Sequence, residues 1–369
     1  MSNSSEFSKK LHRPSRKTHC VSRIAAGVAA AIWYAVCFRP SEGIFEYHKP
    51  KSSLGTCMQV IINGLISGAA IGLLAVGFQA CYLPTRVFFV AAARIYSLAP
   101  FIAYSVQQAT GSLMVGAVCS LLVSAGVALL LELLVHAPLD RRKAASSAHL
   151  VASLGAQITI VAAIAMIWGN QPKTLRQGLD TVTNWNGLII AGAQWVMLFG
   201  SLVSIALFLG FLKFVNLGLN LRAMAENPKA FSLLLLARQR KEPSEARNNQ
   251  GGKINSTFLQ TSGHYRQVAF VSSAVLVGLA SLVTAYDLGF DPHRGLNAVL
   301  LAIVAVIIGG RSTFIGPVIG GLILGLVRSQ IAWHFSARWQ EPASFALLAI
   351  ALLFLPNGIL GDRQRLEAE

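Results

Sequence analysis

The chain has 369 residues, of which 54% are hydrophobic and only 12% are charged. A soluble domain carries about 25% charged residues, so this chain has too little polar surface to cover a soluble globule of its length. The net charge of +16 could indicate nucleic-acid binding. The basic residues instead flank apolar runs, as they do in the cytoplasmic loops of membrane proteins. The five cysteines include no CxxC pair, so neither a disulfide framework nor a zinc site is predicted.

The first 56 residues are expected to form a basic tail and one additional membrane helix. An apolar run at 24–38 follows the tail. A basic segment followed by a short apolar run is also typical of a signal peptide. Arg39 and Pro40 follow the run, however, where a signal peptide would have a small-residue cleavage site. We therefore interpret residues 1–56 as a tail plus an uncleaved helix, with the N-terminus inside the cell.

Nine further apolar runs predict an all-α, polytopic integral membrane protein with about nine to ten transmembrane helices. A helix needs roughly 20 apolar residues to cross the hydrocarbon layer, and most of the runs approach that length. The runs at 296–310 and 343–356 are short, and they are expected to be tilted or incomplete. The predicted spans are residues 58–82, 88–106, 112–135, 149–168, 187–212, 267–286, 296–310, 314–333 and 343–356.

The distribution of Lys and Arg predicts which connections face the cytoplasm. The connections at 137–148 and 213–266 are the most basic, and two spans lie between them, so both can lie on the cytoplasmic side. The connection at 169–186 and residues 287–294 are then expected outside the cell. One orientation therefore satisfies both basic connections.

Glycines are spaced four residues apart within several spans, at 68–72, 316–320 and 321–325. Such GxxxG spacing allows helix backbones to approach closely in lipid, and helix packing is our interpretation of all three. A set of small or amide residues could either line a translocation path or pack helices together. This set comprises Asn63, Gly64, Gly68, Gly309, Gly310 and Gly316.

The chain contains no motif that predicts catalysis or ATP hydrolysis. It has no GxxxxGK[ST], HExxH or GxSxG sequence. An enzyme that works inside the membrane needs convergent polar groups at membrane depth, where they are costly, and the sequence shows no such cluster. We therefore predict a protein that is not an enzyme and that binds no metal or cofactor itself.

Several stretches, in the same order along the chain, resemble the permeases of branched-chain amino acid ABC importers. Residues 59–82, QVIINGLISGAAIGLLAVGFQACY, resemble the opening helix of that family with its Asn-Gly-Leu and closing Tyr. Residues 131–142, LELLVHAPLDRR, are similar to its Glu-Arg-x-x-x-Arg-Pro-Leu-Arg sequence. Residues 290–327 resemble its Pro-x-x-Gly segment, Gly-Gly loop and Gly-Pro helix, and residues 344–361 resemble its last helix. The resemblance is closer to the H-type than to the M-type permease, and urea permeases share these motifs.

One cytoplasmic segment is of special interest, because residues 222–236 have the pattern of an amphipathic helix that begins or breaks near Pro228. Such a helix can dock in a groove on another protein, although an ordinary basic loop has a similar composition. Residues 221–236, LRAMAENPKAFSLLLL, also resemble the coupling segment of the family. The resemblance then implies contact with an ATPase by Arg222, Ala223, Ala225, Glu226, Pro228, Lys229 and Ala230.

The resemblance implies a permease subunit of the bacterial inner membrane that imports branched-chain amino acids or a related small solute such as an amide or urea. Its implied partners are two cytoplasmic ATPases that bind ATP, a second permease subunit and an external substrate-binding protein. No nucleic-acid partner is expected. The permease domain would occupy residues 57–361, with a coupling loop at 213–236 and a short cytoplasmic tail at 362–369.

The chain also departs from the family pattern. Residues 89–93, FVAAA, stand where the family usually has Asn-Phe-Ala-His-Gly. A polar and charged insertion at 237–263 follows the coupling segment, and its composition predicts disorder. These departures leave open a second hypothesis, a membrane protein that keeps the fold but serves as a scaffold or regulator of a related transport complex. A secondary transporter of another family is disfavoured by the order of the motifs.

Overall fold

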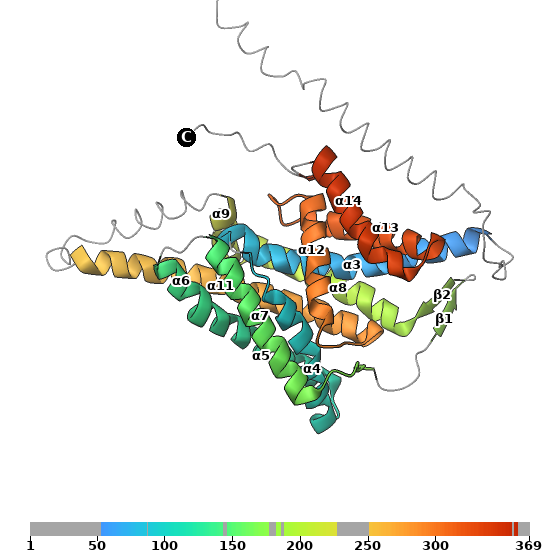
Figure 1. Cartoon of the computed structure of the whole chain (residues 1–369), viewed down its shortest axis with the longest axis horizontal. Helices are drawn as coiled ribbons and strands as arrows, with labels where there is room; N and C mark the ends of the chain where they lie inside the picture. Colours follow the sequence, from blue (N-terminus) through green and yellow to red (C-terminus); the bar gives the residue numbers. More distant parts are fainter. Residues whose placement is uncertain are drawn as a thin grey trace, which may run out of the picture. The chain divides into compact units, whose positions relative to one another are not determined.

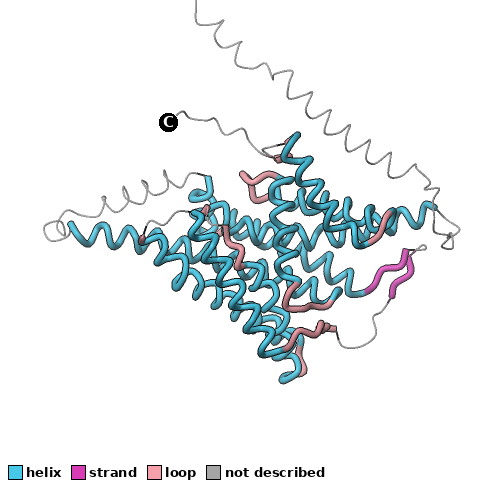
Figure 2. Tube along the Cα trace, in the orientation of Figure 1, coloured by secondary structure: helices cyan, strands magenta, loops and turns pink. Residues whose placement is uncertain are grey.

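The apolar runs fold into α-helices, which make up almost all of the described chain in the computed structural model (Figures 1 and 2). The described residues from 58 onward form one compact unit. The predicted N-terminal tail and additional helix lie outside the described residues, as does the C-terminal tail. The structure describes residues 53–86, 88–142, 146–176, 182–185, 188–226, 251–355 and 358–360.

Each of the nine predicted spans corresponds to a described helix. The helices in chain order are α3 (Ser53–Thr85), α4 (Ala92–Thr110), α5 (Leu113–Leu131), the π-helix η1 (Glu132–His136), α6 (Ala137–Arg141), α7 (Ser146–Trp168), α8 (Gly192–Phe214), α9 (Asn216–Glu226), α11 (Gly251–Leu288), α12 (Arg294–Gly309), α13 (Gly316–His334), the 3₁₀ turn η3 (Ala337–Trp339) and α14 (Gln340–Phe354). The prediction of an all-α polytopic fold is therefore confirmed.

Six of the helices are long and apolar enough to cross a membrane, in α3, in α5 with its continuation to Asp140, and in α7, α8, α11 and α13. The other three predicted spans are helical, but they are either too short or too polar to cross a membrane by the same criterion. Helix α12 has only 16 residues and α14 only 15. Helix α4 has 19 residues, but it carries an arginine and two glutamines, so its polar content is too high for a lipid-facing span.

The predicted span at 187–212 begins too early. Residues Leu188–Ala191 form strand β2, which pairs with β1 (Val182–Trp185) in an antiparallel hairpin, and α8 begins only at Gly192. Figure 2 shows this hairpin as the single pair of strands in the described chain. The Asn-Gly pair at 186–187 of the sequence is a strong hairpin-turn signal. The neighbouring isoleucines merge with the following apolar run and hide this signal in the sequence.

The structure also differs from the prediction of a disordered insertion at 237–263. Residues 251–263 form the first turns of α11, which runs continuously from Gly251 to Leu288. At 1.5 Å per residue these 13 residues extend the helix by about 20 Å. Residues 237–250 lie outside the described residues.

Connections that were predicted to share one side of the membrane lie at the same end of the helix bundle. Arg266 of α11 contacts Asp140 of α6, which brings the two most basic connections together. Lys173 and Phe290 exchange two backbone hydrogen bonds of 2.9 and 2.8 Å, which joins the two connections predicted to lie outside the cell. The alternation of connections that the charge pattern predicts is thus compatible with the packing of the helices.

The helices divide into inner and outer ones. In α3 and α11, 67% and 56% of the apolar segment is buried inside the protein, whereas in α7 the share is 17%. The first six residues of α4, from Ala92 to Ser97, are all buried. The main core cluster is formed largely by α3, α4, α11 and α12. The more polar helix α4 is therefore shielded from lipid by its neighbours.

Candidate functional site

Helix α9 has one face packed on the protein and one face exposed. Gly218 lies against the end of α8, where an added Cβ would come within 2.7 Å of the Leu212 Cα. Leu221 and Ala225 lie on the same buried face, one and two turns further on. The opposite face of α9 is not covered by any of the described residues.

The exposed face of α9 carries three of the predicted coupling residues, Arg222, Ala223 and Glu226. Arg222 Nε lies 3.3 Å from Glu226 Oε1 in an i,i+4 ion pair whose side chains are 60% and 70% exposed. Such exposed pairs contribute little to stability, so both charges remain available to a partner. The prediction that Ala225 contacts an ATPase must be corrected, because its side chain is only 4% exposed and packs within this chain.

The extent of the predicted coupling helix also needs correction. The amphipathic pattern predicted a helix over 222–236, whereas α9 spans Asn216–Glu226 and so begins six residues earlier. Helix α8 ends at Phe214, the single residue Val215 is extended, and α9 begins at Asn216. The predicted coupling residues Pro228, Lys229 and Ala230 lie outside the described residues.

Five charged or ionisable side chains meet near α9, at the end of the bundle that holds the basic connections. We call them the ion cluster: Glu132, His136, Asp140, His149 and Arg266. Arg266 Nε lies 2.5 Å from Glu132 Oε1, and the same guanidinium contacts Asp140. His149 Nε2 lies 3.3 Å from Asp140, and its Nδ1 lies 3.2 Å from His136 Nδ1.

The ion cluster lies at the ends of the predicted spans, and no sequence motif marks it. Glu132 and Arg266 are 2% and 11% exposed, and they come from helices more than 130 residues apart in the sequence. Spacing along the chain cannot bring such residues together. The signal that could have found the pair is the presence of one acid and one base at the ends of otherwise apolar spans.

The backbone under the ion cluster is a π-helix. The Ala137 N–H donates to the Glu132 carbonyl five residues earlier, so η1 is wider than an α-helix. Pro138 follows immediately, and proline lacks an N–H and clashes with the carbonyl four residues before it. The wider turn accommodates this proline and ends with His136 buried at 1% exposure. Short π-helical turns within α-helices are frequent at functional sites.

Helix α9 is linked to the ion cluster through α11. Asn220 Nδ2 of α9 donates to the Tyr265 hydroxyl at 3.2 Å. Tyr265 is adjacent in sequence to Arg266, whose guanidinium joins Glu132 and Asp140. A displacement of α9 would therefore reach the ends of α5 and α6 through two residues of α11.

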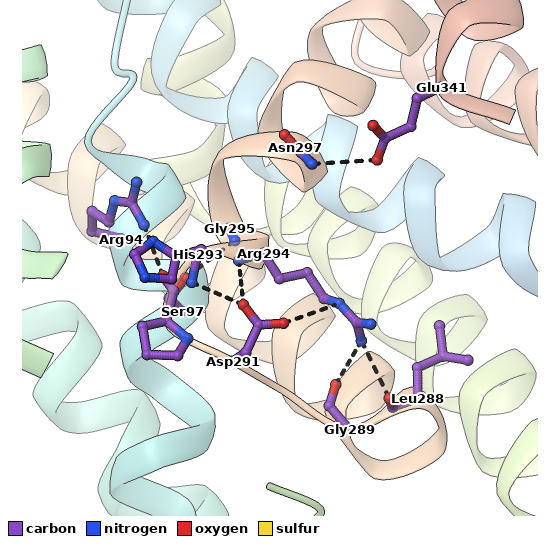
Figure 3. Close-up of polar contacts among 11 residues, drawn as sticks. Arg94, Ser97, Leu288, Gly289, Asp291, His293, Arg294, Gly295, Asn297 and Glu341 are labelled. Atoms are coloured by element: carbon purple, nitrogen blue, oxygen red, sulfur yellow. Dashed lines mark hydrogen bonds and ion pairs between the residues drawn. The ribbon is translucent and has the colours of Figure 1, made fainter. Parts of the chain in front are cut away.

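A second polar region lies where α4 packs against the connection between α11 and α12 (Figure 3). Asp291 Oδ1 accepts the backbone N–H groups of His293 and Arg294, both at 2.9 Å, and so caps α12. Arg294 in turn donates to the carbonyls of Leu288 and Gly289 at the end of α11. The connection between the two helices is thus held by its own side chains.

Helix α4 makes three polar contacts with α11, with α12 and with the connection between them. The Ser97 hydroxyl accepts the Gly295 N–H at 3.2 Å, and the Ser281 hydroxyl of α11 donates to the Tyr96 carbonyl. Arg94 Nη1 donates to the Pro292 carbonyl at 2.8 Å. We call this region the α4 junction. Its polar residues are isolated within apolar runs, so no sequence pattern marks them as candidates.

The predicted path or packing residues lie mainly at close helix crossings. Gly64 and Gly68 of α3 face α13, where an added Cβ at Gly68 would lie 2.9 Å from the Leu322 Cα. Gly316 at the start of α13 lies against the Gly310 carbonyl, 2.6 Å from an added Cβ. Asn63 accepts a hydrogen bond of 3.3 Å from Gln59 at the outer end of α3. The structure therefore supports helix packing for the glycines.

The comparison with known proteins covers nearly the whole chain. The family model described as "Branched-chain amino acid transport system / permease component" matches residues 262–355. The high-affinity branched-chain amino acid transport system permease protein LivH of Escherichia coli (strain K12) is 23% identical over 328 residues, which is 82% of this chain and 95% of that protein. BraD of Pseudomonas aeruginosa, which carries the same description, is 24% identical over 322 residues with the same coverage.

Over most of its length the chain is therefore similar to permeases of branched-chain amino acid transport systems. A more distant relative, the probable branched-chain amino acid transport permease protein LivH of Methanocaldococcus jannaschii, is 22% identical over 320 residues, or 82% of this chain and 92% of that protein. The part that matches the permease family model runs from α11 to α14. It includes the connection at the α4 junction and the glycine-rich face of α13.

Proposed function

We propose that this chain is the membrane-spanning permease subunit of an ABC importer for branched-chain amino acids or a related small solute. The observation that carries this proposal is the alignment with LivH and BraD, which extends over 95% of each of those permeases. The helical bundle contributes the apolar segments that such a subunit needs. Because LivH of Escherichia coli and BraD of Pseudomonas aeruginosa are bacterial proteins, we place the chain in the bacterial inner membrane.

The proposed complex contains two cytoplasmic ATPases, a second permease subunit and an external substrate-binding protein. The sequence has no GxxxxGK[ST] motif, and in this proposal ATP binds to the ATPases and not to the permease. Helix α9 would dock on an ATPase through the face that carries Arg222, Ala223 and Glu226. A short helix with one exposed face is suited to a groove on another protein.

The proposed mechanism couples ATP binding to a shift of helices. Movement of α9 against the ATPase would pass through Asn220 and Tyr265 to α11. Arg266 would then carry the movement to Glu132 in η1 and to Asp140 in α6. Small shifts of packed helices are a common means of switching between two arrangements. In this view, the ion cluster holds the cytoplasmic ends of α5, α6, α7 and α11 together in one of them.

Transport by the reconstituted complex tests the proposed function. The chain would be assembled in proteoliposomes with the ATPases, the partner permease and the binding protein encoded beside it. We expect ATP-dependent uptake of labelled leucine, isoleucine or valine, with urea and a carboxamide as alternative solutes. A complex that assembles and hydrolyses ATP but takes up none of these solutes would favour the scaffold hypothesis.

A further inference from the structure

We propose that Arg94 is the residue that recognises the carboxylate of the transported solute. The proposal rests on the proposed transport of amino acids and adds to it a named binding group. Arg94 is located in the first turn of α4, at the α4 junction (Figure 3). Three observations carry the proposal: its burial, its lack of a counter-ion and its place between the two ends of the bundle.

Arg94 is buried without a compensating negative charge. The residue is 5% exposed, and no carboxylate of the described residues lies within ion-pair distance of its guanidinium. Its Nη1 donates a hydrogen bond to the Pro292 carbonyl, and its Nε has no partner among the described residues. Arg266, in contrast, is 11% exposed and contacts two carboxylates.

A charged side chain inside the membrane is costly, and it usually marks a substrate path or a ligand counter-ion. The hydrogen bond to Pro292 does not explain the charge, because a neutral amide could donate to the same carbonyl. A guanidinium offers five N–H donors in a planar fork that matches a carboxylate. The unused donor of Arg94 therefore points to an anionic group that the described residues do not supply and that a ligand would bring.

The position of Arg94 along the helices is suitable for a solute site. Tyr96, two residues after Arg94 in α4, contacts Ser281 of α11. Ser281 lies 15 residues after Arg266 in the same helix, which is about 22 Å at 1.5 Å per residue. In the other direction, Gln107 donates to the Leu175 carbonyl at the outer end of α4, and it lies about 16 Å beyond Tyr96. Arg94 is thus roughly midway between the ends of the bundle.

The connection that Arg94 contacts runs from the outer end back into the bundle, because Phe290 pairs with Lys173 whereas Pro292 contacts Arg94 in the first turn of α4. Residues between Leu288 and Arg294 connect two helices that meet within the bundle. Non-helical backbone at membrane depth is found where it is buried in protein or lines a water-filled cavity, and interrupted helices form the solute sites of many transporters. Release of the Pro292 carbonyl from Arg94 would expose a complete guanidinium face to the incoming carboxylate.

The test compares a carboxylate solute with its neutral carboxamide in the complete transporter. Leucine and leucinamide uptake would be measured for the unaltered protein, Arg94→Gln and Arg94→Lys, with the loaded fraction of the binding protein determined for each solute. Arg94→Gln keeps a donor for Pro292 but removes the charge. We expect it to lower leucine uptake at least tenfold while leucinamide uptake changes less than threefold, and we expect Arg94→Lys to retain more leucine uptake than Arg94→Gln.

Two results would overturn the proposal. Unchanged leucine uptake by Arg94→Gln would show that the charge is not needed, and an equal loss of leucine and leucinamide uptake would show that Arg94 only positions the α4 junction. Ser281→Ala, which removes a neutral contact of the same region, is the matched control and should affect both solutes equally. Absence of any leucine uptake by the unaltered complex would instead contradict the proposed function itself.

Discussion

At the scale of single residues, buried polar groups in this protein fall into two classes. The ion cluster pairs its charges, since Arg266 contacts both Glu132 and Asp140. Arg94 is buried to a similar degree but lacks a carboxylate partner among the described residues. Paired charges stabilise an arrangement of helices, whereas an unpaired charge retains its capacity for a ligand. The two classes therefore suggest different functions, and they respond differently to substitution.

The buried pair of Glu132 and Arg266 predicts a strong dependence on both partners. Removal of one partner leaves an uncompensated buried charge and typically destabilises a protein by about 3–5 kcal/mol. We expect Glu132→Gln to lower the thermal stability of the purified protein strongly, and the double variant Glu132→Gln/Arg266→Met to be more stable than Glu132→Gln alone. Additive losses in a double-mutant cycle would show that the two side chains do not interact.

The glycines at the crossing of α3 and α13 predict a steric effect. An added Cβ at Gly325 would lie 2.5 Å from the Gly64 carbonyl oxygen, so Gly325→Val would force the helices apart. Overfilling a packed contact costs about 1–3 kcal/mol, and we expect a corresponding loss of thermal stability in detergent. Gly126→Val is the control, because no atom lies within 4 Å of an added Cβ there. Equal stability of the two variants would contradict the close crossing.

At the scale of elements, α9 has one face that packs within the protein and one face that is exposed. Its inner face contains Gly218, Leu221 and Ala225, which hold it to the end of α8 and to the bundle. Its outer face carries the charged pair and Ala223. A small residue on each face allows the contact within the chain to be separated from contact with a partner.

Two tryptophan substitutions on α9 should have different effects. Ala223→Trp is expected to leave the permease stable but to weaken co-purification of the ATPase about tenfold, which corresponds to about 1.4 kcal/mol. Ala225→Trp should instead destabilise the permease itself, because Ala225 is 4% exposed within this chain. Thermal unfolding and co-purification would be measured for both. Normal ATPase binding by Ala223→Trp would mean that this face is not the coupling surface.

At the scale of the whole molecule, the arrangement of connections predicts which parts of the protein face the cytoplasm. The two basic connections meet at Asp140 and Arg266, and Lys173 lies at the opposite end with Phe290. In a variant without native cysteines, Gln171→Cys should react with an impermeant thiol reagent in intact spheroplasts. Arg142→Cys should react only after the membrane is opened. Equal labelling of both positions in intact spheroplasts would contradict the predicted orientation.

The sequence by itself determined the approximate places of the nine spans that the structure describes as helices, because a membrane span requires a long apolar run that is visible in any local window. It also determined which connections lie at the same end, since the excess of Lys and Arg is a property of each connection. The family followed from ordered motifs between residues 58 and 361. The segment that holds α9 was identified for the same reason, although its helix begins six residues earlier than predicted.

Only the tertiary structure decided which side chains meet. Helices α5 and α7 have apolar residues on all sides, with hydropathy values of 2.4 and 2.2, so their pattern does not distinguish a face toward lipid from a face toward the core. The pairing of Glu132 with Arg266 and the burial of Arg94 beside Pro292 both depend on helices far apart in the chain. A sequence records the identity of each polar residue, but the packing of helices determines whether that residue finds a partner.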